Sequence, residues 1–160
     1  FTSDNGMLMG QHRAVGRKGN AYEESIGIPL IVRGPGVPAG RTDAIALTID
    51  LVPTLLELAG VSVPESVDGR SLAPFLRGTP PASWRPDALI ENHGAGPSYS
   101  LRTGEWMYNH QDTEEFELYD MRNDPYQLKN LHRTADPALL DSLRKRLAAL
   151  VACRGASCRS

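Results

Sequence analysis

The sequence has 160 residues, of which 41% are hydrophobic and 22% are charged, close to the averages of globular domains. Its length allows one domain or two small ones. The net charge of −2 gives no basic field for a nucleic acid, and no apolar run approaches the roughly 20 residues that span a bilayer. We therefore expect a globular chain with neither nucleic acid nor membrane as a partner.

The first segment, residues 1–36, alternates apolar runs with a polar loop. Phe1-Thr2-Ser3 is typical of the end of a buried strand, and Asp4-Asn5-Gly6 is typical of the turn that ends it, because these residue types tolerate left-handed backbone. Residues 22–25 predict a short helical turn, and residues 29–32 predict an apolar strand. Polar residues placed after a strand lie at its carboxyl end, where α/β sheets bind ligands.

This loop holds an acid, an amide, a histidine and a lysine: Asp4, Asn5, His12 and Lys18. Carboxylate and amide oxygens suit Ca²⁺ or Mg²⁺, but Ca²⁺ takes about 6–8 oxygens, so other residues must complete such a site. A lysine ammonium suits a tetrahedral oxyanion such as sulfate or phosphate. The loop thus predicts a site that stabilises charge on a transferring oxyanion, with an ordinary turn and a solvated lysine as the alternative.

Residues 49–59 predict a helix that Thr48 or Asp50 caps and that Gly60 ends. Its broad apolar face predicts a core helix and consists of Leu51, Val52, Leu55, Leu56, Leu58 and Ala59. A short helix is expected at 71–76, and the sequence TPPAS at 79–83 is typical of a linker.

The second half predicts a small antiparallel sheet and a final helix. Strands are expected at 87–92, 99–102, 106–109 and 116–120, with a hairpin turn at Thr103-Gly104. The last helix is expected to begin at Asp136-Pro137 and to be amphipathic, with a solvated basic face rather than a polyanion site.

The only two cysteines, Cys153 and Cys158, follow that helix with Gly155 between them. Two cysteines alone make a poor zinc site, and no histidine lies at zinc-finger spacing. The spacing favours a disulfide over two free thiols, which suggests a secreted, periplasmic or otherwise extracytoplasmic protein.

Several motifs occur in an order and spacing that resemble the type I sulfatases, which are arylsulfatase-like enzymes of the alkaline phosphatase superfamily. The motifs are TSDNG at 2–6, GQH at 10–12, KG at 18–19, YEES at 22–25, PLIVRGPG at 29–36, DLVPTLL at 50–56, DGRSL at 68–72, ELYD at 117–120, DP at 124–125 and NL at 130–131. The resemblance covers nearly the whole chain but only the C-terminal part of the family's length.

The resemblance implies an α/β fold in two parts. Residues 1–78 would form the C-terminal portion of an alkaline-phosphatase-like catalytic domain, a mixed sheet with helices. Residues 79–160 would form the sulfatase C-terminal α+β subdomain, a small antiparallel sheet packed on a C-terminal helix. In whole sulfatases this subdomain borders the active-site cleft, so Asn92, His93, Tyr99 and His110 are candidates to reach a substrate, with ordinary surface residues as the alternative.

The resemblance also implies roles for the loop residues. Asp4 and Asn5 match one pair of the family's divalent-metal ligands, usually for Ca²⁺, with Mg²⁺ and Mn²⁺ as alternatives. Lys18 matches the lysine that binds the substrate sulfate and stabilises the leaving group. His12 falls in the family's Gly-Glu-His segment, here with glutamine at the second position, and is a catalytic candidate with a local hydrogen-bonding role as the alternative.

The family's nucleophile is a formylglycine made within a Cys/Ser-x-Pro-x-Arg motif, and no such motif occurs in the 160 residues. The aspartates of the other metal pair are also missing. We therefore expect a C-terminal fragment of a longer sulfatase, whose N-terminal part is its partner and without which it does not hydrolyse sulfate esters. Aryl sulfates, sulfated sugars and glycosaminoglycans all remain possible substrates. The alternatives are a phosphodiesterase or phosphonate monoester hydrolase of the same superfamily, and a non-catalytic structural module.

Overall fold

The computed structural model describes residues 1–92, 98–110 and 115–159. The chain forms two compact units, which we call the helical unit (Phe1, 31–86 and 152–159) and the sheet unit (2–30 and 87–151). Of the places where the chain passes from one unit to the other, the one after Pro86 lies close to the linker predicted at 79–83. The assignment of 1–78 and 79–160 to two parts of a longer enzyme stays a prediction.

The helical unit is built around the buried carboxylate of Asp50. A turn of 3-10 helix, η2 (Thr48–Asp50), leads into α2 (Leu51–Leu58), and α3 (Ala73–Leu76) follows. Asp50 occupies the N-cap position of α2 but makes no capping bond to that helix. Instead its oxygens accept hydrogen bonds from the backbone of Leu47 and Arg70, both at 2.8 Å, and from Arg85. The predicted cap is therefore an anchor for three segments of the unit.

The helix predicted at 49–59 is confirmed, but its expected role as a core helix is wrong in this structure. Val52, Leu55 and Leu58 are 56%, 66% and 51% exposed, whereas Pro53 and Thr54 are buried. The reason is that α2 packs through Thr54, whose hydroxyl donates to the Asp50 carbonyl (2.6 Å) and accepts from the Leu72 N–H (2.8 Å). The apolar face lies on the other side of the helix.

The predicted disulfide between Cys153 and Cys158 is present. It closes a turn, η3 (Gly155–Arg159), that forms hydrogen bonds with the loop 64–68. The Gly155 N–H donates to Asp68, and the Arg159 guanidinium donates to the Val67 carbonyl at 2.8 Å. Gly155 has a φ of 56°, and a Cβ there would lie 2.3 Å from the Glu65 carbonyl oxygen, so the position requires glycine.

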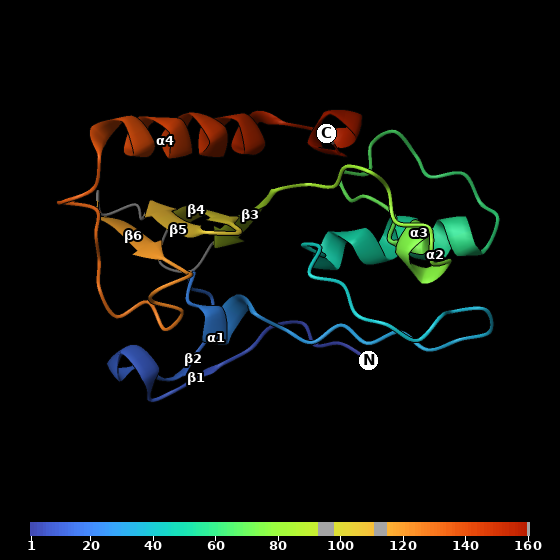
Figure 1. The fold of residues 1–160 in the computed structure, drawn as a ribbon, viewed down its shortest axis with the longest axis horizontal. Helices are drawn as coiled ribbons and strands as arrows, with labels where there is room; N and C mark the ends of the chain where they lie inside the picture. Colours follow the sequence, from blue (N-terminus) through green and yellow to red (C-terminus); the bar gives the residue numbers. More distant parts are fainter. Residues whose placement is uncertain (93–97, 111–114, 160) are drawn as a thin grey trace. The chain divides into compact units, whose positions relative to one another are not determined.

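The sheet unit contains the four-stranded antiparallel sheet that the sequence predicts (Figure 1). Its strands follow the chain order: β3 (Asp87–Asn92), β4 (Ser98–Thr103), β5 (Trp106–His110) and β6 (Phe116–Asp120). The final helix, α4 (Pro137–Ala152), begins where predicted, and Asp136 Oδ1 accepts the Ala138 N–H at 2.8 Å. Among the described residues, no helix is long and apolar enough to cross a membrane.

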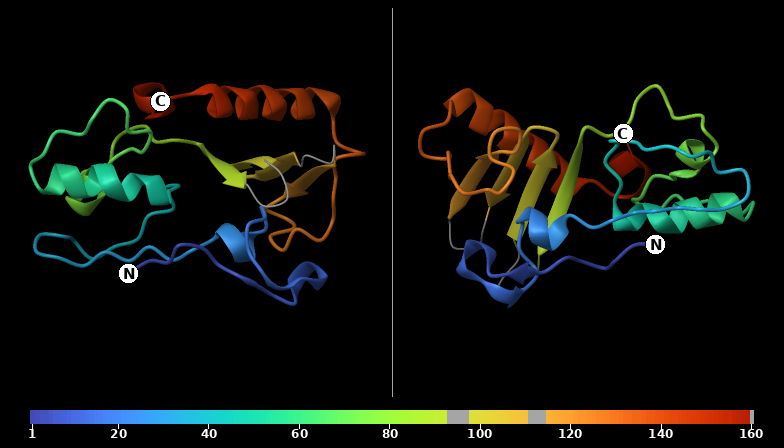
Figure 2. Two further views of the ribbon diagram at one scale, coloured as in Figure 1. Left: turned by 180° about the vertical axis from the view of Figure 1, so that it is seen from behind. Right: turned by 60° about the horizontal axis from the view of Figure 1, so that its bottom comes forward.

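Side chains alternate between the two faces of this sheet, as pleated strands require. On one face, a core of strand residues packs with Leu143 and Leu147 of α4 and contains Leu101, Tyr108 and Leu118. The opposite face lies against segment 2–30 (Figure 2). Met107 and Tyr119 pack there beside Ala21. We call these the helix face and the loop face.

Segment 2–30 contains the hairpin β1 (Leu8–Met9) and β2 (Val15–Arg17), the turn η1 (Gln11–Arg13) and the predicted short helix α1 (Glu23–Ile26). The buried strand expected at its start is wrong in this structure, since Thr2 makes a single antiparallel bridge to Leu30 and is exposed. Glu23 of α1 pairs with Arg102 of β4 at 2.6 Å, which ties the segment to the loop face.

Candidate functional site

Lys18 lies directly after β2, between two glycines with left-handed backbone, and the second of them forms hydrogen bonds with neighbouring elements. Gly16 and Gly19 have φ values of 65° and 77°, a left-handed conformation that glycine adopts most readily. The Gly19 N–H donates to Ser25 Oγ at 3.2 Å, and its carbonyl accepts from the Asn92 amide. Lys18 itself is exposed, so its ammonium group is available to a ligand while its backbone is held.

Asp4 presents an exposed carboxylate in the turn that precedes β1. Its Oδ1 accepts the backbone N–H of Asn5 at 2.9 Å and the hydroxyl of Ser3 at 3.3 Å. The hydrogen bond from Asn5 lowers the pKa of the Asp4 carboxyl below its ordinary value, and the positive charge of Lys18 lowers it further. Asp4 is therefore ionised at neutral pH and lies within electrostatic reach of Lys18.

The turn has the chemistry of part of a hard-cation site. The Asn5 amide nitrogen donates to the Gly6 carbonyl at 2.6 Å, which leaves the amide oxygen as the ligating end beside the Asp4 carboxylate. Gly6 fixes the turn against α1, since its N–H donates to the Ser25 carbonyl at 2.8 Å and a Cβ on it would lie 2.0 Å from the Glu24 carbonyl. No group of three or more His, Cys, Asp or Glu side chains converges within the described ranges, so Asp4 and Asn5 supply only part of a ligand set.

His12 lies in a packed layer rather than at the end of a free loop. Its ring stacks on Tyr22, with centroids 3.7 Å apart and planes inclined by 5°. Its Nε2 is 3.7 Å from Glu24 Oε2, and the His12 side chain is 12% exposed. Sequence reasoning did not find this stack; the available signal was an aromatic residue placed four positions after Lys18, at the start of α1.

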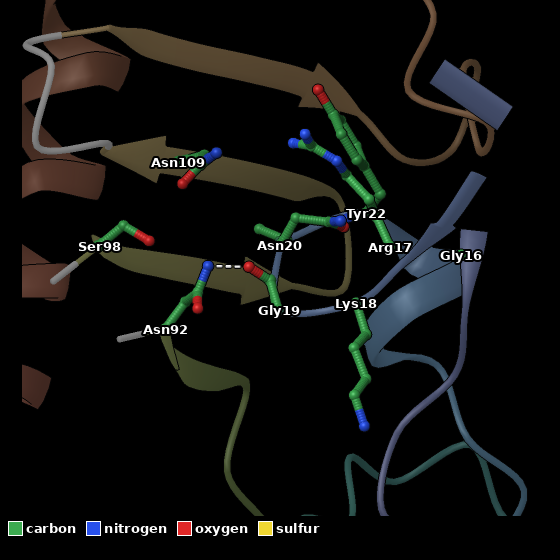
Figure 3. A pocket seen from close by; sticks show the side chains of 10 residues that line it. Gly16, Arg17, Lys18, Gly19, Asn20, Tyr22, Asn92, Ser98 and Asn109 are labelled. Atoms are coloured by element: carbon green, nitrogen blue, oxygen red, sulfur yellow. Dashed lines mark hydrogen bonds between the residues drawn. The ribbon is translucent and has the colours of Figure 1, made fainter. Parts of the chain in front are cut away.

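A partly open pocket of about 520 Å³ lies between residues 16–22 and the loop face of the sheet. Asn92, Ser98 and Asn109 line it from the strands (Figure 3). Its strand side is polar and joined by hydrogen bonds: the Asn109 amide oxygen accepts from the Ser100 hydroxyl at 2.7 Å, and the Asn109 amide nitrogen donates to Glu117 at 3.0 Å. In Figure 3 the Lys18 side chain extends away from Asn109 and Ser98.

Tyr22 joins this pocket to the sheet. Its hydroxyl donates to Glu117 Oε1 at 3.3 Å. Burial raises the pKa of the Tyr22 phenol, and the negative charge of Glu117 raises it further, so Tyr22 keeps its proton and its donor role at neutral pH.

The residues proposed to reach a substrate from the small sheet divide between its faces. Asn92 lies on the loop face and lines the pocket. Tyr99 and His110, which pair with each other across β4 and β5, lie on the opposite face, where Tyr99 packs on the helix-face core. Strand alternation therefore directs both side chains away from this pocket, and their contact with a substrate in the whole enzyme stays a prediction. His93 lies outside the described residues.

Known proteins are similar in sequence to this chain over most of its length. Residues 10–152 match the family described as N-sulphoglucosamine sulphohydrolase, C-terminal. The N-acetylglucosamine-6-sulfatase of Homo sapiens is 35% identical over 100% of this chain and 36% of its own length. The N-acetylglucosamine-6-O-sulfatase of Bacteroides thetaiotaomicron is 37% identical over 86% of this chain and 27% of its own length. The chain thus spans about a third of the length of the curated relatives it matches.

Solved structures share its fold. A protein in complex with its substrate D-glucosamine-2-N,6-O-disulfate has a TM-score of 0.82 at 34% identity, covering 92% of this chain and 32% of that protein. The phosphonate monoester hydrolase of Agrobacterium radiobacter has a TM-score of 0.82 at 32% identity, covering 95% of this chain and 34% of that enzyme.

Proposed function

Since this chain belongs to the N-sulphoglucosamine sulphohydrolase C-terminal family, and so to the sulfatases, we propose that it is the C-terminal part of an enzyme that hydrolyses sulfate esters of sugars. We call that whole protein the parent enzyme. One observation carries the proposal: the segment 2–30 of this family member presents an exposed lysine, Lys18, between two left-handed glycines, together with the exposed carboxylate of Asp4. The N-terminal part of the parent enzyme supplies the nucleophile, which the family resemblance implies to be formylglycine.

Lys18 binds the sulfate group and stabilises the leaving oxygen. As the sulfur–oxygen bond to the alcohol breaks, negative charge grows on the alcohol oxygen, and an ammonium group beside it lowers the energy of that state. Fixing its backbone at Gly16 and Gly19 reduces the freedom that the side chain loses when it takes up this position.

Asp4 and Asn5 are the residues that would hold a divalent cation, with Ca²⁺ favoured over Mg²⁺ or Mn²⁺. The carboxylate of the exposed Asp4 and the amide oxygen of the half-buried Asn5 match the ligands that Ca²⁺ takes. When bound, the cation supplies positive charge to the sulfate oxygens. Asp4 contributes a ligand that needs no deprotonation at neutral pH, because its pKa is already lowered.

The pocket favours a sulfated glycan over an aryl sulfate as the substrate. Amides and a hydroxyl line its strand side, and such groups exchange hydrogen bonds with sugar hydroxyls. Relatives named as N-acetylglucosamine-6-sulfatases agree with this chemistry. The disulfide supports secretion or another oxidising, extracytoplasmic location for the parent enzyme.

The parent enzyme with N-acetylglucosamine 6-sulfate, 4-nitrophenyl sulfate and 4-nitrophenyl phosphate tests the proposal. We expect kcat/KM to be highest for the sulfated sugar and at least about tenfold lower for the phosphate ester, a difference of about 1.4 kcal/mol in transition-state binding. Mass spectrometry of the same sample should find formylglycine.

Faster turnover of the phosphate ester would favour the second candidate, a phosphodiesterase or phosphonate monoester hydrolase, which the likeness to the Agrobacterium radiobacter enzyme keeps open. No turnover of any ester in the presence of Ca²⁺ would favour a non-catalytic module.

A further inference from the structure

His12 and Tyr22 bracket Lys18 in the sequence and meet in space. Their stacked rings, 3.7 Å apart at the centroids, close the segment 12–22 into a loop that contains Lys18. The contact joins the tip of the β1–β2 hairpin to the start of α1. The stack therefore links the two ends of the segment that carries Lys18.

The backbone at the hairpin tip is unusual in a way that this contact explains. His12 and its neighbour Arg13 have φ values of 52° and 58°, a left-handed conformation that the Cβ atom disfavours. Such conformations persist where the surroundings determine them, and they gather at functional sites. Here the Arg13 side chain is exposed, whereas the His12 ring is packed, so the packed contact lies on the His12 side of the pair.

Glu24 completes the contact from α1. Its Oε2 is buried, has no hydrogen-bond partner among the described residues, and lies 3.7 Å from His12 Nε2. A buried carboxylate oxygen without a partner is costly, and the facing imidazole nitrogen is the group that can satisfy it when it carries a proton.

Helix α1, which His12 contacts, is itself bound to the sheet. Glu23 pairs with Arg102 at 2.6 Å, and its backbone N–H donates to Gln127 Oε1 at 2.8 Å. The Tyr22 hydroxyl donates to Glu117 of β6. The His12 ring thus rests on a support that the four-stranded sheet holds in place.

We propose that His12 is a positioning residue: by stacking on Tyr22 and facing Glu24, it fixes the loop that presents Lys18 to the sulfate group. His12 acts through Lys18 and does not itself touch the substrate. The inference rests on the proposed function for the role of Lys18, but the closure of the loop is a property of this chain alone.

A double-mutant cycle in the parent enzyme tests the proposal. We expect His12→Ala to lower kcat about 10- to 100-fold with a smaller change in KM, because the ammonium group is misplaced. In a Lys18→Ala background the same change should lower kcat less than about twofold further, since the group that His12 positions is gone. His12→Phe, which keeps a ring on Tyr22, should recover part of the loss. Arg13→Ala, in the same turn, should leave kcat unchanged.

Amide hydrogen exchange supplies a readout that needs no activity. Exchange of residues 14–19 should become at least about tenfold faster in His12→Ala and stay unchanged in Arg13→Ala. Equal exchange in the two variants, or kcat losses that multiply fully in the double variant, would overturn the proposal. If His12→Ala does not fold, His12→Phe and Glu24→Gln replace it, since each removes the contact between His12 and Glu24. Exchange of residues 14–19 in these two variants is then compared with that in Arg13→Ala.

An inactive parent enzyme would count against the proposed function, while the exchange experiment would still decide the role of His12.

Discussion

Arg85 places two guanidinium nitrogens on the carboxylate of Asp50, with Nη1 2.6 Å from Oδ2 and Nη2 2.8 Å from Oδ1. The two side chains are 6% and 0% exposed. Backbone N–H groups of Leu47 and Arg70 donate to the same oxygens. The pair is thus bidentate, buried and fully hydrogen-bonded, which is the arrangement in which loss of one partner costs most.

We expect Arg85→Ala to lower the free energy of unfolding by about 3–5 kcal/mol, because it leaves the Asp50 charge buried without a cation. Urea denaturation of the parent enzyme measures this. Arg41→Ala is the matched control, since the Arg41–Asp43 pair is about nine-tenths exposed and should contribute less than about 1 kcal/mol. Equal losses in the two variants would contradict the anchoring role of Asp50.

Lys18→Ala should lower kcat of the parent enzyme about 10²- to 10³-fold while leaving its melting temperature unchanged. The reason is that Lys18 is exposed, so its side chain contributes to chemistry rather than to packing. Lys129→Ala, another exposed lysine of the sheet unit, is the control and should change neither quantity. Turnover that survives Lys18→Ala would remove this lysine from the mechanism.

Asp4→Ala should weaken divalent-metal binding. After treatment with a chelator, the Ca²⁺ concentration that restores half of the activity should rise at least about tenfold in this variant. Loss of a residue that merely supports a metal ligand already lowers metal affinity by about 10- to 100-fold, and loss of the ligand itself should lower it at least as much. Asp120→Ala serves for comparison, since the pKa of this half-buried aspartate at the end of β6 is also lowered, mainly by a hydrogen bond from Asn123. A similar rise in both variants would indicate a general charge effect instead of a ligand.

His132 should make the stability of the parent enzyme depend on pH below about pH 6.5. Burial lowers the pKa of its imidazole, and the charges of Arg144 and Arg133 lower it further. The ring stacks on Phe116, with centroids 5.0 Å apart, and its Nε2 has no hydrogen-bond partner among the described residues.

The unfolded chain therefore binds a proton at a higher pH than the folded one. Stability from this group is complete above the unfolded value of about 6.5 and is lost as the pH falls through the lower, folded value. Urea unfolding between about pH 6.5 and 5 should show this slope, and His132→Phe should reduce it. Carboxylates with lowered pKa, such as Asp141, titrate below that window and do not obscure it. An unchanged slope in His132→Phe would refute the assignment.

Replacing both Cys153 and Cys158 by serine should destabilise the helical unit by about 2 kcal/mol, the loop-closure contribution of so short a ring. The local effect should be larger at residues 64–68, which η3 holds through Gly155 and Arg159. Hydrogen exchange with and without reductant measures it: the wild-type protein should respond to reductant at these residues, and the double variant should not. If reductant changes exchange at residues 64–68 in neither protein, the turn η3 keeps its structure without the disulfide.

The elements that the sequence predicted best are those with strong local signals. Strand-like runs bounded by turn residues predicted β3 to β5, and alternation predicted β6. Asp136-Pro137 predicted the start of α4, and the spacing of the two cysteines predicted the disulfide. Each of these depends on neighbours within a few positions of the chain, which a single sequence contains in full.

Contacts between distant positions could not be predicted in this way. The pair of Glu23 with Arg102 spans 79 positions, and nothing in either local pattern identifies its partner. Asp50 was expected to cap a helix, but its side chain binds Arg85, 35 positions away. The exposed face of α2 was predicted as core because periodicity shows which residues share a face and does not show what covers that face.

The register of β4 sets a limit on how this protein can change. Ser100 and Arg102 serve the loop face, while Leu101, one residue away, lies in the core under α4. A single-residue insertion in this strand would exchange the two sets, bringing leucine to the pocket and polar groups to the core. Substitutions at every second position of β4 therefore change the loop face and leave the core residues in place, whereas a one-residue insertion changes both faces.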